Sequence, residues 1–303
     1  MVLESDQGEL LGTALGFEQR SRHKWLAPFS GTLWLDALPV TRSNEETEVE
    51  EFLRLVDKHA QESRLVTLRI GSYASRDFSM RLRKLGFSTT DRMEYEVALT
   101  LPEEKLWSDL GDKRRNQVRR AARTGVVIHE LPPEEGIFEY HRLRCGTIER
   151  IRDKGVCIID AETHGGRDPL HVLLDSGYGR ILCASIDGKV VGALVFSHFN
   201  ELVYNHLAAY DQVAYKAQAP SLLLWESIKR YKSEGAKVLS LGGVKAAAVR
   251  EDSPEHGVYM FKSKFASTCR ACADGEKIAH GTLNELMKLG RNLRTALGRR
   301  IKL

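Results

Sequence analysis

The run from residue 180 to residue 210 constrains the fold most, because local pattern alone assigns its elements. Two apolar, β-leaning stretches, 180–186 and 189–199, are separated only by Asp187-Gly188, a dipeptide typical of two-residue hairpin turns. A third such stretch, 202–210, follows after two polar residues. The sequence therefore predicts three consecutive antiparallel strands.

A helix and a fourth strand are expected next. Pro220 suits the first turn of a helix, where a missing N–H costs nothing, and apolar residues recur at helical spacing from there to Tyr231. Gly235 follows this helix at the position where a residue with left-handed backbone geometry is expected to end it. Residues 237–241 then predict a short buried strand, at whose end Gly242-Gly243 would let backbone or ligand approach closely.

The first hundred residues also alternate strands and helices. The pattern predicts strands over 9–18, 26–36, 65–70 and 93–99, and helices over 45–62 and 76–85. After it we expect a basic helix that ends at Gly125, a strand over 126–131 and a helix over 138–152. Since the second half has a similar alternation, we predict an α/β (α+β) fold with two related domains, 1–100 and 101–279.

Positive charge is clustered although the net charge is only +4. Six cations stand close together, Lys113, Arg114, Arg115, Arg119, Arg120 and Arg123, and the chain after Glu285 has cations but no acid. Val118, Ala121 and Ala122 give this first run a narrow apolar stripe, so we expect its cations to face outward. Such a run is usually a solvated helix face, but two of them favour a polyanionic partner.

Composition excludes several classes of protein. Hydrophobic content of 42% and charge of 28% are typical of a soluble globular protein, and no apolar run approaches the roughly 18 residues of a membrane span. The N-terminal residues lack the pattern of a signal peptide, and five scattered cysteines fit a reducing cytoplasm. Cys269 and Cys272 form a lone CxxC without a second pair, so we expect no metal site.

Four segments together resemble the Fem-type (FemABX) aminoacyl-tRNA-dependent transferases, whose two domains are each similar to the GNAT acetyltransferase fold. These segments are 106–125, 187–193, 217–220 with its helix, and 241–243 followed by Phe261-Lys262 and Phe265. The resemblance implies two GNAT-like domains, with the C-terminal helix at about 280–303 packed on the first.

The same resemblance implies an activity. An amino acid would pass from aminoacyl-tRNA, as co-substrate, to an amine of a peptide-like acceptor, forming a peptide bond without metal or other cofactor. Known acceptors of the family are peptidoglycan precursors and intermediates of peptidyl or nucleoside antibiotics. This chain departs from the family pattern in its short N-terminal region and in lacking a long heptad hairpin, so the acceptor stays open, as does the oligomeric state.

Lys262 matches the family's lysine, which lies near the aminoacyl end of the tRNA. Phe261 beside it is a candidate to stack on the terminal adenine, as aromatic side chains do on unpaired bases. Gly242 and Gly243 are candidate binding residues at the strand end. The alternative is that Phe261 belongs to the core and Lys262 is a surface charge.

Further candidates come from the third predicted strand and the helices. Tyr204, His206 and Asp211 lie on or just after that strand, and His206 is a candidate base for the amine's proton, with a hydrogen-bonded core histidine as the alternative. Arg150 is a candidate ligand for an acceptor phosphate, or else a solvent-facing side chain. Arg115, Arg119 and Arg123, spaced four apart, are expected to contact tRNA phosphates.

Two other functions remain open. An acyltransferase of this fold that uses acyl-CoA would hold the pyrophosphate on a glycine-rich turn at a helix N-terminus. The corresponding turn here, 214–220, has no glycine and ends in a proline that donates nothing, which disfavours CoA. A non-catalytic RNA-binding module would leave Gly242-Gly243 and Phe261-Lys262 without a role.

Overall fold

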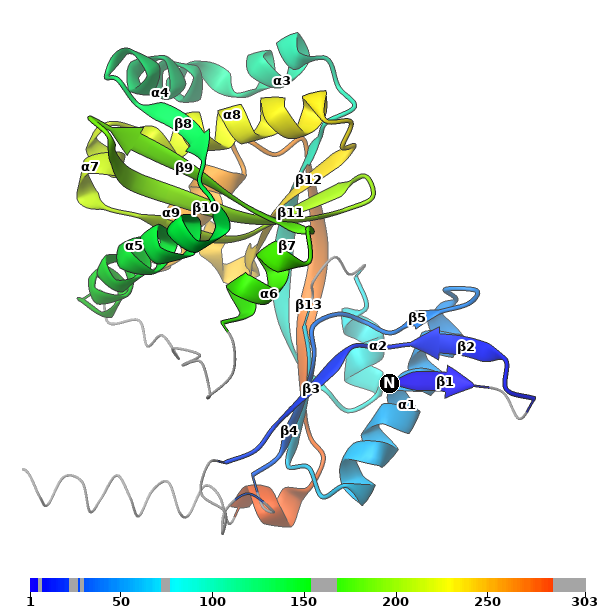
Figure 1. The fold of residues 1–303 in the computed structure, drawn as a ribbon. Coiled ribbons are helices and arrows are strands. Elements are labelled where there is room, and N and C mark those ends of the chain that lie inside the picture. Colours follow the sequence, from blue (N-terminus) through cyan, green and yellow to red (C-terminus); the bar gives the residue numbers. More distant parts are fainter. Residues whose placement is uncertain (5–6, 22–26, 28–29, 72–76, 154–167, 286–303) are drawn as a thin grey trace, which may run out of the picture. The chain divides into compact units, whose positions relative to one another are not determined.

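The computed structural model describes residues 1–4, 7–21, 27, 30–71, 77–153 and 168–285 (Figure 1). The chain divides into two units, one made of residues 1–93 and 270–303 and the other of residues 94–269. Two strands cross the boundary between them, β7 (Ser88–Ala98) and β13 (Thr268–Ile278). The fold is mixed α/β, as the sequence predicts.

The sheet of unit 94–269 has the strand order β7-β12-β11-β10-β9-β8. Its other strands are β8 (Val127–Glu130), β9 (Gly179–Ile186), β10 (Lys189–Phe199), β11 (Leu202–Tyr210) and β12 (Val238–Lys245). The predicted run of three antiparallel strands is confirmed as β9, β10 and β11. Asp187 and Gly188 both have positive φ, 50° and 75°, which is the geometry of a type I′ hairpin turn.

Strands β11 and β12 are parallel but pair over only three residues. Leu202–Tyr204 pairs with Val238–Ser240, whereas β11 runs on to Tyr210 and β12 to Lys245. The two strands therefore separate after Tyr204 and Ser240. The prediction that the strand ends at residue 241 is wrong, because β12 continues through both glycines, with Gly242 at a φ of 73°.

Helices cover both faces of this sheet, with α8 (Ala219–Ser233) on one face and α5 (Pro133–Asp153) on the other (Figure 1). Helix α8 is buried through Leu223, Leu224 and Tyr231, and Gly235 follows its end at a φ of 89°, as predicted. The remaining helical segments are α3 (Glu103–Asp109), α4 (Gly111–Arg123), α6 (Pro169–Asp175), α7 (Gln212–Lys216), the 3₁₀ turn η2 (Ala246–Val249) and α9 (His256–Lys262).

Unit 1–93 with 270–303 contains a small sheet of order β1-β2-β5 and a larger one of order β3-β4-β6-β13-β7. Its elements are β1 (Val2–Glu4), β2 (Leu10–Thr13), β3 (Gly16–Gln19), β4 (Thr32–Leu35), β5 (Val40–Thr41), α1 (Glu46–Glu62), β6 (Thr67–Ile70) and α2 (Ser79–Lys84). The predicted single strand over 9–18 is thus two strands in different sheets. Periodicity alone does not reveal a change of pairing partner.

The segment that precedes the C-terminus begins as a helix. Residues 281–285 are helical, and the backbone N–H of Asn284 donates to the carbonyl of His280. The rest of the predicted helix at 280–303 lies outside the described residues. Within the described part of the chain, no helix is long and apolar enough to cross a bilayer.

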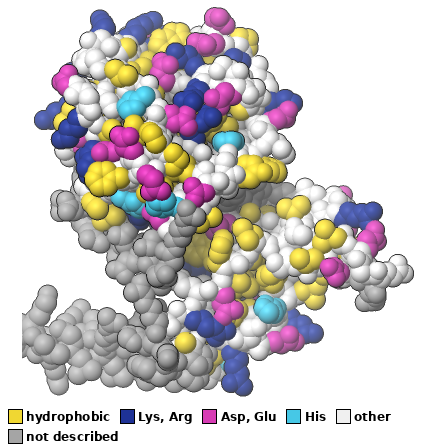
Figure 2. All heavy atoms as spheres, in the orientation of Figure 1, with side chains coloured by type: hydrophobic (Ala, Val, Ile, Leu, Met, Phe, Trp, Pro, Cys, Tyr) yellow, Lys and Arg dark blue, Asp and Glu magenta, His cyan; other side chains and the backbone are white. Residues whose placement is uncertain are grey.

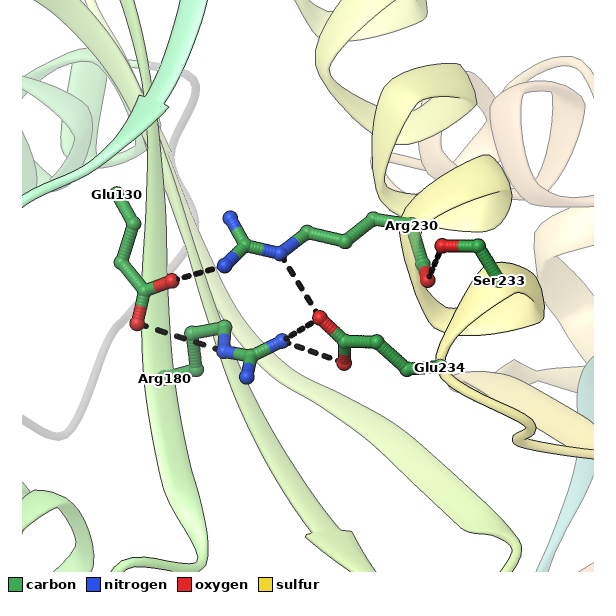
Figure 3. A network of polar contacts seen from close by, with 5 residues as sticks. All are labelled: Glu130, Arg180, Arg230, Ser233 and Glu234. Atoms are coloured by element: carbon green, nitrogen blue, oxygen red, sulfur yellow. Dashed lines mark hydrogen bonds and ion pairs between the residues drawn. The ribbon is translucent and has the colours of Figure 1, made fainter.

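Charged side chains of both signs are interspersed over the face drawn in Figure 2. One group forms a closed ring, in which Arg180 and Arg230 each contact both Glu130 and Glu234 (Figure 3). The Nη1 atom of Arg180 donates to both carboxylate oxygens of Glu234 at 2.8 and 2.7 Å. Because these residues come from β8, β9 and the end of α8, the ring ties one helix to two strands.

Candidate functional site

The backbone where β11 and β12 separate is held by a buried hydrogen-bond chain. The backbone N–H of Gly242 donates to Ser240 Oγ at 3.1 Å, and Ser240 Oγ donates to Glu94 Oε1 at 2.9 Å. Glu94 and Ser240 are each only 2% exposed. Because buried polar groups are costly unless paired, this chain fixes the position of Gly242.

Lys262 reaches this opening. Its Nζ donates to the carbonyl oxygen of Gly243 at 3.2 Å. A Cβ added at Gly242 would lie 3.3 Å from that Nζ, 3.5 Å from the hydroxyl of Tyr204 and 3.6 Å from the carbonyl oxygen of Asn205. The absence of a side chain at Gly242 therefore lets the ammonium and the phenol approach the separated strands. Four residues predicted from the sequence, Tyr204, Gly242, Gly243 and Lys262, meet here.

The segment that carries Lys262 is a helix rather than an extended loop. Residues His256–Lys262 form α9, with Lys262 in its last turn. Lys262 and Lys264 would point to opposite sides only if this segment were extended, whereas a helix turns about 100° per residue. Lys264 lies just beyond the helix and is exposed.

Arg114 is the residue of this region that the sequence analysis did not single out. Its guanidinium donates to Gln117 Oε1 at 2.7 Å, to Ser221 Oγ at 3.1 Å and to the carbonyl of Met260 at 3.5 Å. It also lies over two rings of the α9 region, 4.8 Å from the centroid of Phe261 and 5.2 Å from that of Phe265. The two ring centroids are themselves 5.2 Å apart, so Arg114, Phe261 and Phe265 all lie close to one another.

The spacing of residues along α4 indicates that Arg114 is partly buried. Arg114 precedes Val118 by four residues and Ala121 by seven, so it lies on the face that those two residues bury. Burial lowers the pKa of Arg114 from its ordinary value. The prediction that the cations of this helix face outward is therefore wrong for Arg114.

The three arginines predicted to contact phosphates differ from one another. Arg115 donates to the carbonyl of Ser108 at 2.6 Å and pairs with Asp112 at 2.5 Å, so its side chain closes the end of α3. Arg119 is exposed and lies 5.4 Å from the ring centroid of Trp107. Arg123 is exposed, and its Nε donates to the carbonyl of Arg119 at 3.4 Å.

The remaining candidates have distinct surroundings. His206 is exposed rather than buried in the core, its Nε2 lies 2.6 Å from Ser197 Oγ, and its ring centroid is 4.8 Å from that of Tyr204. The Asp211 carboxylate accepts from the backbone N–H of Ala214 at 2.8 Å and caps α7. Arg150 lies in α5, but its side chain is outside the described part of the structure.

The CxxC pair does not form a cysteine site. Cys269 and Cys272 lie on β13, where residues three apart point to opposite faces, and Cys269 is exposed whereas Cys272 is buried. Neither is bonded to another cysteine. Among the described residues, no group of three or more His, Cys, Asp or Glu side chains is arranged to hold a metal ion.

Comparisons with known proteins agree on the fold. Residues 162–262 match the model of an acetyltransferase (GNAT) domain. The crystal structure of FemX is similar with a TM-score of 0.68 and 13% identity, covering 94% of this chain and 89% of that one. A search of curated protein sequences gives no match.

Two other solved structures are also similar. The C-terminal domain of a putative lysylphosphatidylglycerol synthetase from Agrobacterium fabrum has a TM-score of 0.60 and 15% identity, covering 94% of this chain and 86% of that one. L-PGS from Bacillus licheniformis has a TM-score of 0.55 and 18% identity, covering 95% and 88%. Because these identities are low, they show the fold alone, which is a Fem-like GNAT fold.

Proposed function

We propose that this chain is an aminoacyltransferase that moves an amino acid from aminoacyl-tRNA to an amine of a peptide-like acceptor in the cytoplasm. The observation that carries the proposal is the position of Lys262, whose ammonium is held on the Gly243 carbonyl where β11 and β12 separate. An aminoacyl ester is already activated, so alignment and charge stabilisation suffice for transfer.

In the proposed reaction the acceptor amine attacks the ester carbonyl carbon. A C–N bond forms, the C–O bond to the tRNA ribose breaks, and the proton lost by the amine balances the one gained by the ribose oxygen. Lys262 would stabilise the negative charge on the carbonyl oxygen in the tetrahedral intermediate. His206, exposed and hydrogen-bonded to Ser197, is the candidate base.

The second candidate is an N-acyltransferase that uses acyl-CoA, which the match to an acetyltransferase (GNAT) domain favours. The start of α8 argues against it. Gln218 has a φ of 61°, Pro220 in the first turn has no N–H to donate, and the Ser221 hydroxyl already contacts Arg114 and Gln117. A pyrophosphate would find fewer donors here than at a glycine-rich turn.

The test compares donors. Purified protein is incubated with a pool of labelled aminoacyl-tRNAs and small-molecule cell extract, with phosphatidylglycerol vesicles as a separate acceptor arm because of the synthetase named above. We expect label to pass from tRNA to an acceptor, and we expect no labelled product when the donor has been treated with ribonuclease beforehand. Product that survives ribonuclease but requires acyl-CoA would replace this proposal with the second candidate.

A further inference from the structure

Arg114 carries a positive charge that its surroundings do not neutralise. Its hydrogen-bond acceptors are an amide oxygen, a hydroxyl and a backbone carbonyl, all uncharged. Within the described part of the chain no carboxylate forms an ion pair with it. By contrast, Arg115, Arg142 and Arg180 in the same unit each pair with at least one acid.

Burial makes this charge costly. Arg114 is half-buried and burial lowers its pKa, so the folded chain holds a guanidinium that is partly removed from water without a counter-charge. Ser221, one of its partners, lies in the first turn of α8, where the helix dipole is also positive and adds nothing to the neutralisation. An anion from outside the chain would remove this cost.

The guanidinium is also held in one orientation. It stacks on Phe261 and Phe265, and its hydrogen bonds reach α8 at Ser221 and α9 at Met260. A planar guanidinium that is fixed in this way suits phosphate, which it can bind through two parallel hydrogen bonds. Phe261 is followed directly by Lys262, so one ring that the Arg114 guanidinium lies over belongs to the same short helix, α9, as the proposed catalytic ammonium.

We propose that Arg114 binds a phosphodiester of the donor RNA close to its aminoacylated end. This inference rests on the proposed function. It assigns the phosphate contact to Arg114 instead of Arg115, because the Arg115 side chain is already paired with Asp112 and with the carbonyl of Ser108 at the end of α3. The diphosphate of CoA offers the same chemistry, so the experiment includes it as a separate arm.

The test measures the affinity of the full chain for deacylated tRNA, and separately for CoA, over a range of salt concentrations. We expect Arg114→Gln to weaken tRNA binding about 10- to 100-fold, the usual effect of losing a charged hydrogen bond. We also expect the slope of log affinity against log salt to fall by about 0.7, since one single-strand phosphate contact is lost. Arg114→Lys keeps a charge and should keep the slope.

Arg115→Gln is the matched control, and its slope should equal that of the wild type. An unchanged slope in Arg114→Gln, with tRNA binding by the wild type intact, would overturn the inference and leave Arg114 a residue that only positions α9. A weaker affinity of Arg114→Gln for CoA alone would assign the anion to CoA and overturn the RNA source. Failure of the wild type to bind tRNA at all would instead count against the proposed function.

Discussion

At the scale of single residues, the proposed chemistry depends most on Lys262. Its Nζ donates a hydrogen bond to the Gly243 carbonyl and lies beside Gly242, whose lack of a side chain leaves room for this ammonium and for the hydroxyl of Tyr204. We expect Lys262→Met to fold normally, since the side chain is only half-buried, and to transfer about 10²- to 10³-fold more slowly because an oxyanion stabiliser is lost. Single-turnover transfer from saturating charged tRNA, with thermal melts alongside, checks this.

Lys264→Met is the control for that measurement. Lys264 is exposed and lies just past the end of α9, so its loss should leave the transfer rate unchanged. Equal rates for Lys262→Met and the wild type would remove Lys262 from the mechanism, and a loss only in Lys264→Met would reassign the role.

The sequence predicted part of this site and missed another part. Gly242, Gly243 and Lys262 can be identified from the sequence. Paired glycines let backbone or ligand approach a strand closely, and an aromatic-lysine pair follows them. Arg114 was hidden in a run of cations that is usually solvated, and only its spacing from Val118 distinguishes it. The capping hydrogen bond of Asp211 depends on where α7 begins, which the residue pattern does not specify.

At the scale of elements, the ring of Glu130, Arg180, Arg230 and Glu234 joins α8 to β8 and β9 (Figure 3). Burial raises the pKa of Glu234, but hydrogen bonds from Arg180 and Arg230 outweigh it, so the net pKa lies below its ordinary 4.5. The charged carboxylate therefore stabilises the fold at neutral pH, and this contribution is lost as pH falls below about 4.5 through the folded pKa.

Glu234→Gln should accordingly be less stable than the wild type at pH 7, by about 1 kcal/mol or less because the group is largely in contact with solvent. The difference should shrink on acidification. Urea unfolding at several pH values checks this, with the exposed Glu251→Gln as control. A difference between Glu234→Gln and the wild type that is the same at every pH would mean that the loss is one of packing.

Prediction of elements succeeded where local turn chemistry is decisive. Asp187-Gly188 and Gly235 determine the ends of β9, β10 and α8 through positive φ angles, and these ends were placed within one residue. The sequence does not indicate α9, because the seven residues His256–Lys262 are too short a run for helical spacing to be recognised. The predicted end of β12 at residue 241 is wrong, because β12 continues through two glycines beyond its pairing with β11, and the residue pattern does not indicate such a continuation.

At the scale of the whole molecule, the first unit is built from two distant parts of the chain. Strand β13 pairs with β6 over Gly275–Ile278, and Lys277 Nζ donates to Asp57 Oδ2 and to the carbonyl of Leu85, each at 2.7 Å. A fragment of residues 1–93 lacks β13. The edges of β6 and β7 that β13 covers in the full chain are therefore exposed in the fragment. We expect no cooperative unfolding transition from it by circular dichroism.

Adding a peptide of residues 268–285 should restore a transition, and the same peptide with Lys277→Glu should not, because a carboxylate would face Asp57. A fragment 1–93 that melts cooperatively alone would show that β13 is dispensable for this unit.

The helical form of α9 has a consequence for how this chain could be lengthened or shortened. Within α9 the chain sets both a distance and a phase, because every residue added or removed between His256 and Lys262 turns the Lys262 side chain by about 100° around the helix axis. A loop in the same place would absorb a one-residue insertion with a small shift. Here the insertion would direct the ammonium away from the strand opening while leaving every residue type intact, so the site is more sensitive to the spacing between its parts than to many exchanges of side chain.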